Sequence, residues 1–122
     1  MKLFVYGTLQ AGFGNNRLLK DSKFLSKGST SPNFTLISLG GFPGLLDQGQ
    51  TRVNGEVWEV DAETLANCDR LEGHPNWYRR TPVTLEDGTE VETYIYLTCP
   101  PKEVEGRTIA SGDWKAHLGR TT

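Results

Sequence analysis

The sequence predicts an α+β fold with a mixed, mostly antiparallel sheet, because segments with strand character outnumber helical segments and mostly follow one another. One helical segment of about three turns and a shorter one are expected to flank the sheet. The adjacent glycines Gly40 and Gly41 allow such a sheet to curl into a small, partly closed β-barrel. With 122 residues and no internal repeat or linker, the chain is expected to form a single domain over residues 1–122.

Composition and charge argue against several classes of function. Thirteen basic and fifteen acidic residues give a formal net charge of -2, and no run of lysine or arginine is present, so no nucleic-acid partner is expected. No segment is long and apolar enough for a signal peptide or a membrane span, which predicts a cytoplasmic protein without a membrane partner. Cys68 and Cys99 are widely separated, and only His74 and His117 accompany them, so packing is favoured over a disulfide or a metal site.

The N-terminal segment predicts a central strand followed by a glycine-rich loop. Leu3 to Tyr6 is apolar without alternation, which is typical of a short strand covered on both faces, and the strand breaks at Gly7. After the loop over residues 8–14, Asn15 is expected to cap a short helix that ends at Leu19. A strand that runs into a glycine turn before a helix can present backbone amides to an anion, although most such loops are only turns. The glycine spacing matches neither the Walker nor the dinucleotide fingerprint.

The middle of the chain predicts two strands and a helix. Asn33 to Leu39 is expected to be a strand, with the cluster at residues 40–44 bending the chain before Leu45. Val53 to Val60 is expected to be the next strand and leads directly into a helix start at Asp61.

The predicted helix carries the most informative residue of the chain. Asp61 can accept a hydrogen bond from the first turn, and Gly73 offers a left-handed cap, so the helix should run from Ala62 to Glu72. At 100° per residue, Glu72 falls on the apolar side, between Leu65 and Cys68. Burial there would raise the pKa of the carboxyl and suit it to proton transfer. The alternative is that the last turn frays and Glu72 meets only water or Arg79.

A hairpin is expected after the helix. Thr81, Val83 and Leu85 share one face of a strand, Asp87-Gly88 predicts a type I′ turn, and Val91 to Leu97 alternates as the return strand. Tyr94 and Tyr96 lie on the opposite face, which is either an amphipathic outer surface or the wall of a site.

The C-terminal part predicts one further strand. Pro100-Pro101 should end the hairpin, a polar stretch follows, and Ile109 to Trp114 is expected to be a last strand. Trp58, Trp77 and Trp114 are expected to pack in the core.

Several motifs, in their order and spacing, resemble the gamma-glutamylcyclotransferase-like family over almost the full chain. They are Phe4-Val5-Tyr6-Gly7-Thr8-Leu9, Gly41-Phe42-Pro43-Gly44, Gly55-Glu56-Val57 with Val60-Asp61, Asp69 to Gly73 with Pro75, Tyr78 with Arg80, and Gly112-Asp113-Trp114, which resembles the family's closing strand. Thr8 in place of serine looks less like the glutathione-specific branch of the family. The Glu72-Gly73-His74-Pro75 segment looks more like gamma-glutamylamine cyclotransferase.

The resemblance implies a small mixed barrel with flanking helices and a cavity between the Tyr-Gly-Thr-Leu loop and the helix-end glutamate. The amides of Gly7, Thr8 and Leu9 would bind the glutamyl carboxylate, and Glu72 would be the acid/base catalyst that forms 5-oxoproline and a free amine. No cofactor is implied. Tyr6 would either line this cavity or simply end the core strand.

Tyr78 and Arg80, which follow the predicted helix, are expected to have different roles. Tyr78 could hydrogen-bond the substrate, whereas Arg80 is expected to pair with Asp69.

The leading hypothesis is a gamma-glutamyl amide cyclotransferase with a small gamma-glutamyl molecule as its partner. The reaction needs no protein nucleophile, since the substrate's own amine attacks its gamma-carbonyl. One alternative is a non-catalytic module that binds an acidic metabolite at the same loop. The other is an enzyme that acts on a different gamma-glutamylated metabolite, because loops such as residues 44–53 set substrate identity.

Overall fold

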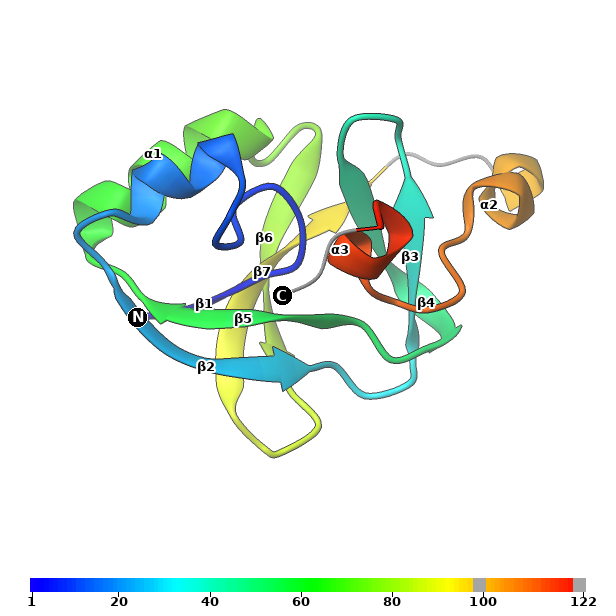
Figure 1. The fold of residues 1–122 in the computed structure, drawn as a ribbon, viewed down its shortest axis with the longest axis horizontal. Coiled ribbons are helices and arrows are strands. Elements are labelled where there is room, and N and C mark those ends of the chain that lie inside the picture. The colour runs from blue at the N-terminus through cyan, green and yellow to red at the C-terminus, as the bar shows by residue number, and fades with distance from the viewer. Residues whose placement is uncertain (98–100, 120–122) are drawn as a thin grey trace.

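The computed structural model describes residues 1–97 and 101–119, and Figure 1 shows how their strands and helices are arranged. The strands are β1 (Lys2–Val5), β2 (Lys23–Ser29), β3 (Phe34–Ser38), β4 (Pro43–Thr51), β5 (Asn54–Glu59), β6 (Tyr78–Thr84) and β7 (Glu90–Tyr96). The helices are the 3-10 helix η1 (Gly14–Leu19) and the α-helices α1 (Ala62–Glu72), α2 (Pro101–Arg107) and α3 (Trp114–His117).

The sheet is mixed and mostly antiparallel, as predicted. β1 lies in the middle of a five-stranded sheet with the order β2-β5-β1-β7-β6. It pairs antiparallel with β5 and parallel with β7, where Leu3 lies opposite Glu92. The remaining neighbours, β2 with β5 and β6 with β7, are antiparallel. β3 and β4 form a separate antiparallel pair.

The five-stranded sheet curls without closing. The residues just after its two edge strands, β2 and β6, form an isolated bridge between Thr30 and Leu85, next to a hydrogen bond from the amide of Glu86 to the carbonyl of Ser29. Within the described residues, β3 and β4 pair with each other in their own sheet instead of completing a ring. The structure therefore supports a curled sheet and not a closed barrel.

Apolar side chains on β1 alternate between two core clusters, one on each face of the sheet. Leu3 and Val5 face the α1 side, whereas Phe4 and Tyr6 face the β3–β4 hairpin. Figure 1 shows α1 and η1 side by side on one side of the sheet and the hairpin on the other. Because both faces of β1 are covered, its uninterrupted apolar run is explained.

The helix α1 forms as its sequence predicts. Its bounds are those expected, and the side chain of Asp61 accepts a hydrogen bond from the amide of Thr64 at 2.7 Å. Gly73 caps the other end in the left-handed region, with φ of 65°. These local signals fix the position of Glu72 at the last turn.

The β6–β7 hairpin is confirmed, but its turn is not type I′. Gly88 has φ of 90°, whereas no described non-glycine residue has a positive φ, so Asp87 cannot take its part in a type I′ turn. The amide of Gly88 instead donates to the carbonyl of Leu85 at 2.9 Å. This is a three-residue loop ending in a left-handed glycine, which the strand twist also accepts.

The expected strand from Ile109 to Trp114 is wrong. Only Thr108 makes a bridge, to Ile37, and the chain then turns at Gly112. Asp113 accepts a hydrogen bond from the amide of Ala116 at 3.0 Å and so caps α3. The Gly-Asp-Trp motif is the start of a helix because an aspartate cap satisfies an otherwise free amide.

Three elements were not predicted from the sequence. β4 (Pro43–Thr51) occupies most of residues 44–53, which were expected to form a loop, and this expectation is wrong because the segment pairs with β3. β2 is an edge strand whose side chains are largely exposed, so it lacks the apolar alternation that predicts strands. The helix α2 occupies the polar stretch for which no element was predicted, and it begins with proline, a residue that is tolerated at the first helical position. Cys99 and Pro100, to which expectations were attached, lie outside the described residues.

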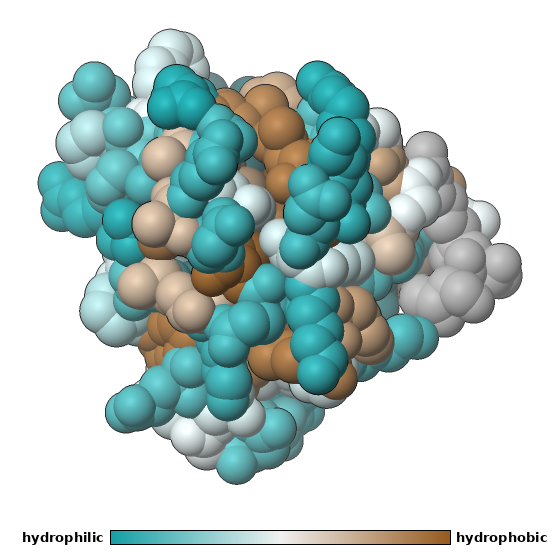
Figure 2. Space-filling model, turned by 90° about the vertical axis from the view of Figure 1, so that its left-hand side faces the viewer, coloured by the Kyte–Doolittle hydropathy of each residue, from teal (hydrophilic) through white to brown (hydrophobic). Residues whose placement is uncertain are grey.

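The surface on the α1 side is mainly polar. Figure 2 shows hydrophilic side chains over most of this face, with hydrophobic atoms visible between them. Among the described residues, no helix has the length and apolarity needed to cross a membrane.

Candidate active site

All six site residues predicted from the sequence line one pocket of about 460 Å³. These residues are Tyr6, Gly7, Thr8, Leu9, Glu72 and Tyr78. The pocket lies between the loop after β1, the last turn of α1, and the starts of β4 and β6. A volume of this size is typical of small-molecule sites.

Glu72 is half-buried at the pocket wall, as its position on the helical wheel predicts. Loss of solvent around the carboxyl raises its pKa to about 7. No described residue donates a hydrogen bond to this carboxyl or forms an ion pair with it. The frayed alternative, in which Glu72 meets Arg79, is therefore not observed, and the group can exchange a proton near neutral pH.

The loop after β1 lines the pocket and carries backbone amides without acceptors among the described residues. Within the part of the chain that the structure describes, the amides of Gly7, Thr8 and Leu9 have no hydrogen-bond acceptor. The carbonyl of Gly7 is occupied, since it accepts from the amide of Gln10 at 3.1 Å and from its side chain at 3.3 Å. Successive free amides in a turn can hold an anion.

Asparagine side chains fasten this loop from outside. Asn15 does not cap η1; its amide group donates to the hydroxyl of Thr8 at 3.0 Å. Asn16 donates to the carbonyl of Leu9 at 2.7 Å. The prediction of an Asn15 cap is thus wrong, because the 3-10 turn leaves this side chain free to bind the preceding loop.

Gly7 is required by packing against β4. A Cβ atom at this position would lie 2.7 and 2.8 Å from two ring carbons of Pro43. A side chain at position 7 would therefore clash with the proline ring of the protein itself.

A buried ion pair that the sequence analysis missed supports the same loop. Glu56 on β5 accepts hydrogen bonds from the amide of Ala11 at 2.9 Å and from the indole of Trp58 at 3.1 Å. Its other oxygen pairs with the ammonium group of Lys115 at 3.2 Å. The sequence places this glutamate directly before Val57 and Trp58 in the predicted strand but gives no sign of its lysine partner.

Two tyrosines form the inner wall. The hydroxyl of Tyr6 donates to the carbonyl of Tyr94 at 2.7 Å, and that of Tyr78 donates to the carbonyl of Pro43 at 2.7 Å. Tyr6 directly follows β1, packs in the core and lines the pocket. Burial, with the charge of Glu72 as a smaller cause, raises the pKa of both hydroxyls well above the ordinary value. Both therefore stay protonated.

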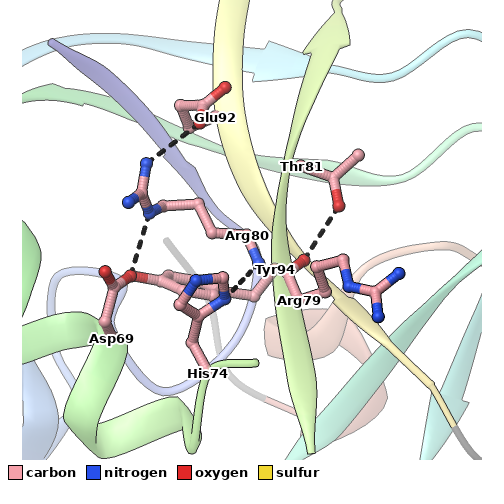
Figure 3. A network of polar contacts seen from close by, with 7 residues as sticks. All are labelled: Asp69, His74, Arg79, Arg80, Thr81, Glu92 and Tyr94. Atoms are coloured by element: carbon pink, nitrogen blue, oxygen red, sulfur yellow. Dashed lines mark hydrogen bonds and ion pairs between the residues drawn. The ribbon is translucent and has the colours of Figure 1, made fainter. Parts of the chain in front are cut away.

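A polar network holds the end of α1 against the sheet (Figure 3). One oxygen of Asp69 accepts from the hydroxyl of Tyr94 at 2.7 Å and pairs with Arg80 at 3.0 Å. Arg80 also pairs with Glu92 at 3.0 Å, and its amide donates to His74 at 2.9 Å. The predicted Asp69–Arg80 pair is confirmed, and Tyr94 belongs to the wall of the site.

The predicted packing of Cys68 and of two of the three tryptophans is confirmed. Cys68 is buried and free, and burial raises its thiol pKa to about 12. Trp58 and Trp114 are buried, but Trp77 is 66% exposed and its predicted core role is wrong. Among the described residues, no group of three or more histidine, cysteine or acidic side chains could hold a metal ion.

Comparison with known proteins agrees with this arrangement. The profile of the family described as "Gamma-glutamyl cyclotransferase, AIG2-like" matches residues 3–116. A protein of Methanocaldococcus jannaschii, whose name assigns it provisionally to the gamma-glutamylcyclotransferases, is 39% identical over 121 residues, or 96% of this chain and 98% of its own. The gamma-glutamylcyclotransferase family protein YtfP of Escherichia coli K12 is 35% identical over 115 residues, or 93% and 96%.

A solved structure shows the same fold. The AIG2-like protein from Mus musculus superimposes with a TM-score of 0.81 at 28% identity, covering 99% of this chain and 94% of that chain. The family match spans the loop after β1, the end of α1 and the start of β6, which together form the pocket. The chain therefore belongs to the gamma-glutamyl cyclotransferase, AIG2-like family.

Proposed function

We propose that this protein is a gamma-glutamyl amide cyclotransferase that uses Glu72 first as a general base and then as a general acid. The substrate's alpha-amine attacks its own gamma-carbonyl and closes a five-membered ring. The carbon–nitrogen bond to the leaving amine then breaks, which yields 5-oxoproline and a free amine. The observation that carries the proposal is the unpaired, half-buried carboxyl of Glu72 in the same pocket as the free amides after β1.

The proton balance supports this role for Glu72. A substrate amine with a pKa near ~8 is mostly protonated at neutral pH and must lose a proton before it can attack. An ordinary glutamate near ~4.3 is a poor base for this amine, whereas the raised pKa of Glu72, about 7, comes within about one unit of it. The neutral acid formed in this step can then give its proton to the leaving amine, and the regenerated carboxylate takes the second proton, which the ring nitrogen loses on becoming the N–H of 5-oxoproline.

The loop supplies the binding half of the proposal. The amides of Gly7, Thr8 and Leu9 would hold the substrate's alpha-carboxylate, because free donors in a turn attract an anion. Holding both ends of the glutamyl group in a reactive geometry can lower the barrier by about 7–11 kcal/mol. The hydroxyl oxygen of Tyr78 can accept one hydrogen bond from the substrate while its own O–H continues to donate to the carbonyl of Pro43.

The test is a measurement of 5-oxoproline released from gamma-glutamyl-alanine, gamma-glutamyl-epsilon-lysine and glutathione. We expect turnover of at least one of these amides, and its loss in the Glu72→Gln variant. The matched control is Glu63→Gln, an exposed position in the first turn of the same helix, which should retain activity. A thermal shift with ligand but no product from any gamma-glutamyl amide would instead indicate a binding module.

A further inference from the structure

Three of the protein's large exposed apolar side chains gather at the mouth of the pocket. Phe42 is 47% exposed, Leu71 is 43% exposed and Trp77 is 66% exposed, and all three line the pocket that contains Glu72. They come from the loop before β4, the last turn of α1 and the segment before β6. Single exposed apolar residues are ordinary, but several that converge on one concave site mark a ligand surface.

Trp77 lies beside the reacting end of the site. A Cβ atom at Gly73, the residue after Glu72, would lie 2.9 Å from the Cδ1 atom of the indole ring. The glycine therefore lets the ring pack directly over the end of α1. A group bonded to the substrate's gamma-carbonyl, which must come close to Glu72, would meet this ring as it leaves the pocket.

The pocket has room for more than the glutamyl group. A cavity of about 150 Å³ holds benzene, with its six carbon atoms. On that scale a glutamyl group of about nine heavy atoms fills roughly half of the 460 Å³ available. The remaining volume includes the mouth, where the leaving amine would lie.

Charge at the mouth disfavours a charged leaving group. The only ionised side chains that line the pocket among the described residues are Glu72, which the reaction uses, and Arg70. Arg70 is exposed and its guanidinium already donates to the side chain of Asn67. An ammonium group on the leaving amine would therefore find no free acidic partner. A carboxylate on the leaving amine would find only the solvent-exposed guanidinium of Arg70, which contributes little to binding.

We propose that Phe42, Leu71 and Trp77 form an apolar rim that binds the tail of the leaving amine, so that the enzyme prefers gamma-glutamyl amides of uncharged, apolar primary amines. This inference rests on the proposed cyclotransferase activity and specifies its substrate class. The tail takes no part in bond changes: the amide bond breaks, and the tail departs on the protonated nitrogen.

Four amides of graded tail chemistry test the rim. They are gamma-glutamyl-methylamide, gamma-glutamyl-pentylamide, and the aminopentyl and carboxybutyl amides, whose tails have five carbon atoms like pentyl but end in a charge. We expect kcat/KM for the pentylamide to exceed that for the methylamide by about 10- to 100-fold, since a methylene in an apolar site contributes measurably to discrimination. Both charged tails should fall below the pentylamide.

Substitutions at the rim locate the preference. Trp77→Ala should bring the pentyl-to-methyl ratio to within about threefold, mainly through a higher KM for the pentylamide, because tail contacts are equal in bound substrate and transition state. Trp77→Phe should keep most of the ratio. Phe42→Ala should lower it, whereas Phe24→Ala, which removes a 44% exposed aromatic ring from β2 outside the pocket, should not.

The possible outcomes separate this inference from the activity on which it rests. If the enzyme turns over these amides with a pentyl-to-methyl ratio of kcat/KM near one, the proposed rim is wrong. The rim is also wrong if Trp77→Ala keeps the ratio of the unsubstituted protein. Both results leave the proposed cyclotransferase activity unaffected. A higher kcat/KM for the carboxybutyl amide than for the pentylamide would show that Arg70 binds the tail, in place of the apolar rim. A higher kcat/KM for the aminopentyl amide than for the pentylamide would show that the mouth of the pocket binds a cationic tail, in place of an apolar one. Absence of 5-oxoproline from all four amides overturns both proposals.

Discussion

Replacing Glu72 with glutamine should stabilise the protein more at alkaline pH than at acidic pH. The pKa of Glu72 is raised from 4.5 to about 7 in the folded protein by loss of solvent. Between these values the folded state holds a proton that the unfolded state releases, so stability falls as pH rises through this window. Glutamine, which resembles the neutral carboxyl in shape, removes this dependence.

The magnitude follows from the difference in pKa. A rise from 4.5 to about 7 corresponds to a destabilisation of about 3 kcal/mol once the pH lies above the folded-state pKa and the carboxyl is ionised in both states. Nearly all of it should develop between pH ~4.5 and pH ~8.

The assay is urea unfolding of both proteins, followed by tryptophan fluorescence at several pH values across this window. Other titrating groups are common to both proteins and cancel in the difference between their free energies of unfolding. Cys68 and Tyr78, whose pKa values the charge of Glu72 helps to raise, titrate above this range. The exposed Glu63→Gln variant should show no comparable change.

A difference that stays constant from pH ~4.5 to pH ~8 would refute the reasoning, since Glu72 would then have the ordinary pKa of a solvated carboxyl. The same pKa should appear in catalysis. With Glu72 as general base, kcat/KM should rise about tenfold per pH unit below pH 7 and then level, as the carboxylate form becomes populated.

Three further substitutions test the support around the pocket by urea unfolding. Gly7→Ala places a methyl group 2.7 Å from a proline ring carbon and should destabilise the fold by about 1–3 kcal/mol while lowering turnover; unchanged stability would show that the loop can shift. Arg80→Met breaks two ion pairs and should cost about 1–3 kcal/mol, against little change for the exposed Arg79→Met, and equal losses would contradict a specific role. Glu56→Gln leaves the buried ammonium of Lys115 unpaired and should cost about 3–5 kcal/mol, much of which Lys115→Met in the same chain should restore. A mild effect of Glu56→Gln on the free energy of unfolding, or no recovery in the double variant, would show that this ion pair does not stabilise the loop.

The best predicted elements are those whose sequence signals lie within a few residues of the element itself. The bounds of α1 follow from an aspartate that caps one end and a glycine that adopts the left-handed region at the other. Because the helical repeat is regular, the same two caps place Glu72 on the buried side. The six proposed site residues could be named in advance from such patterns and from the family resemblance, although their roles stay predictions.

Signals that depend on distant partners were misread. β2 is held by pairing with β5, yet its exposed side chains carry no strand pattern. Asp113 is a helix cap because the chain turns at Gly112, where a side chain would collide with the carbonyl of Arg52. Trp77 was expected in the core on its size alone, but it lies at the mouth of the pocket.

The sequence by itself determined the caps of α1, the apolar run of β1 and the acid at the helix end, since each depends on hydrogen bonds and side-chain periodicity within one segment. Only the tertiary structure decided that this acid shares a pocket with the free amides after β1. It also decided that Glu56 meets Lys115, 59 residues away, beneath the same loop. Contacts of this kind arise when the sheet brings remote segments together, and no pattern along a single segment encodes which ones will meet.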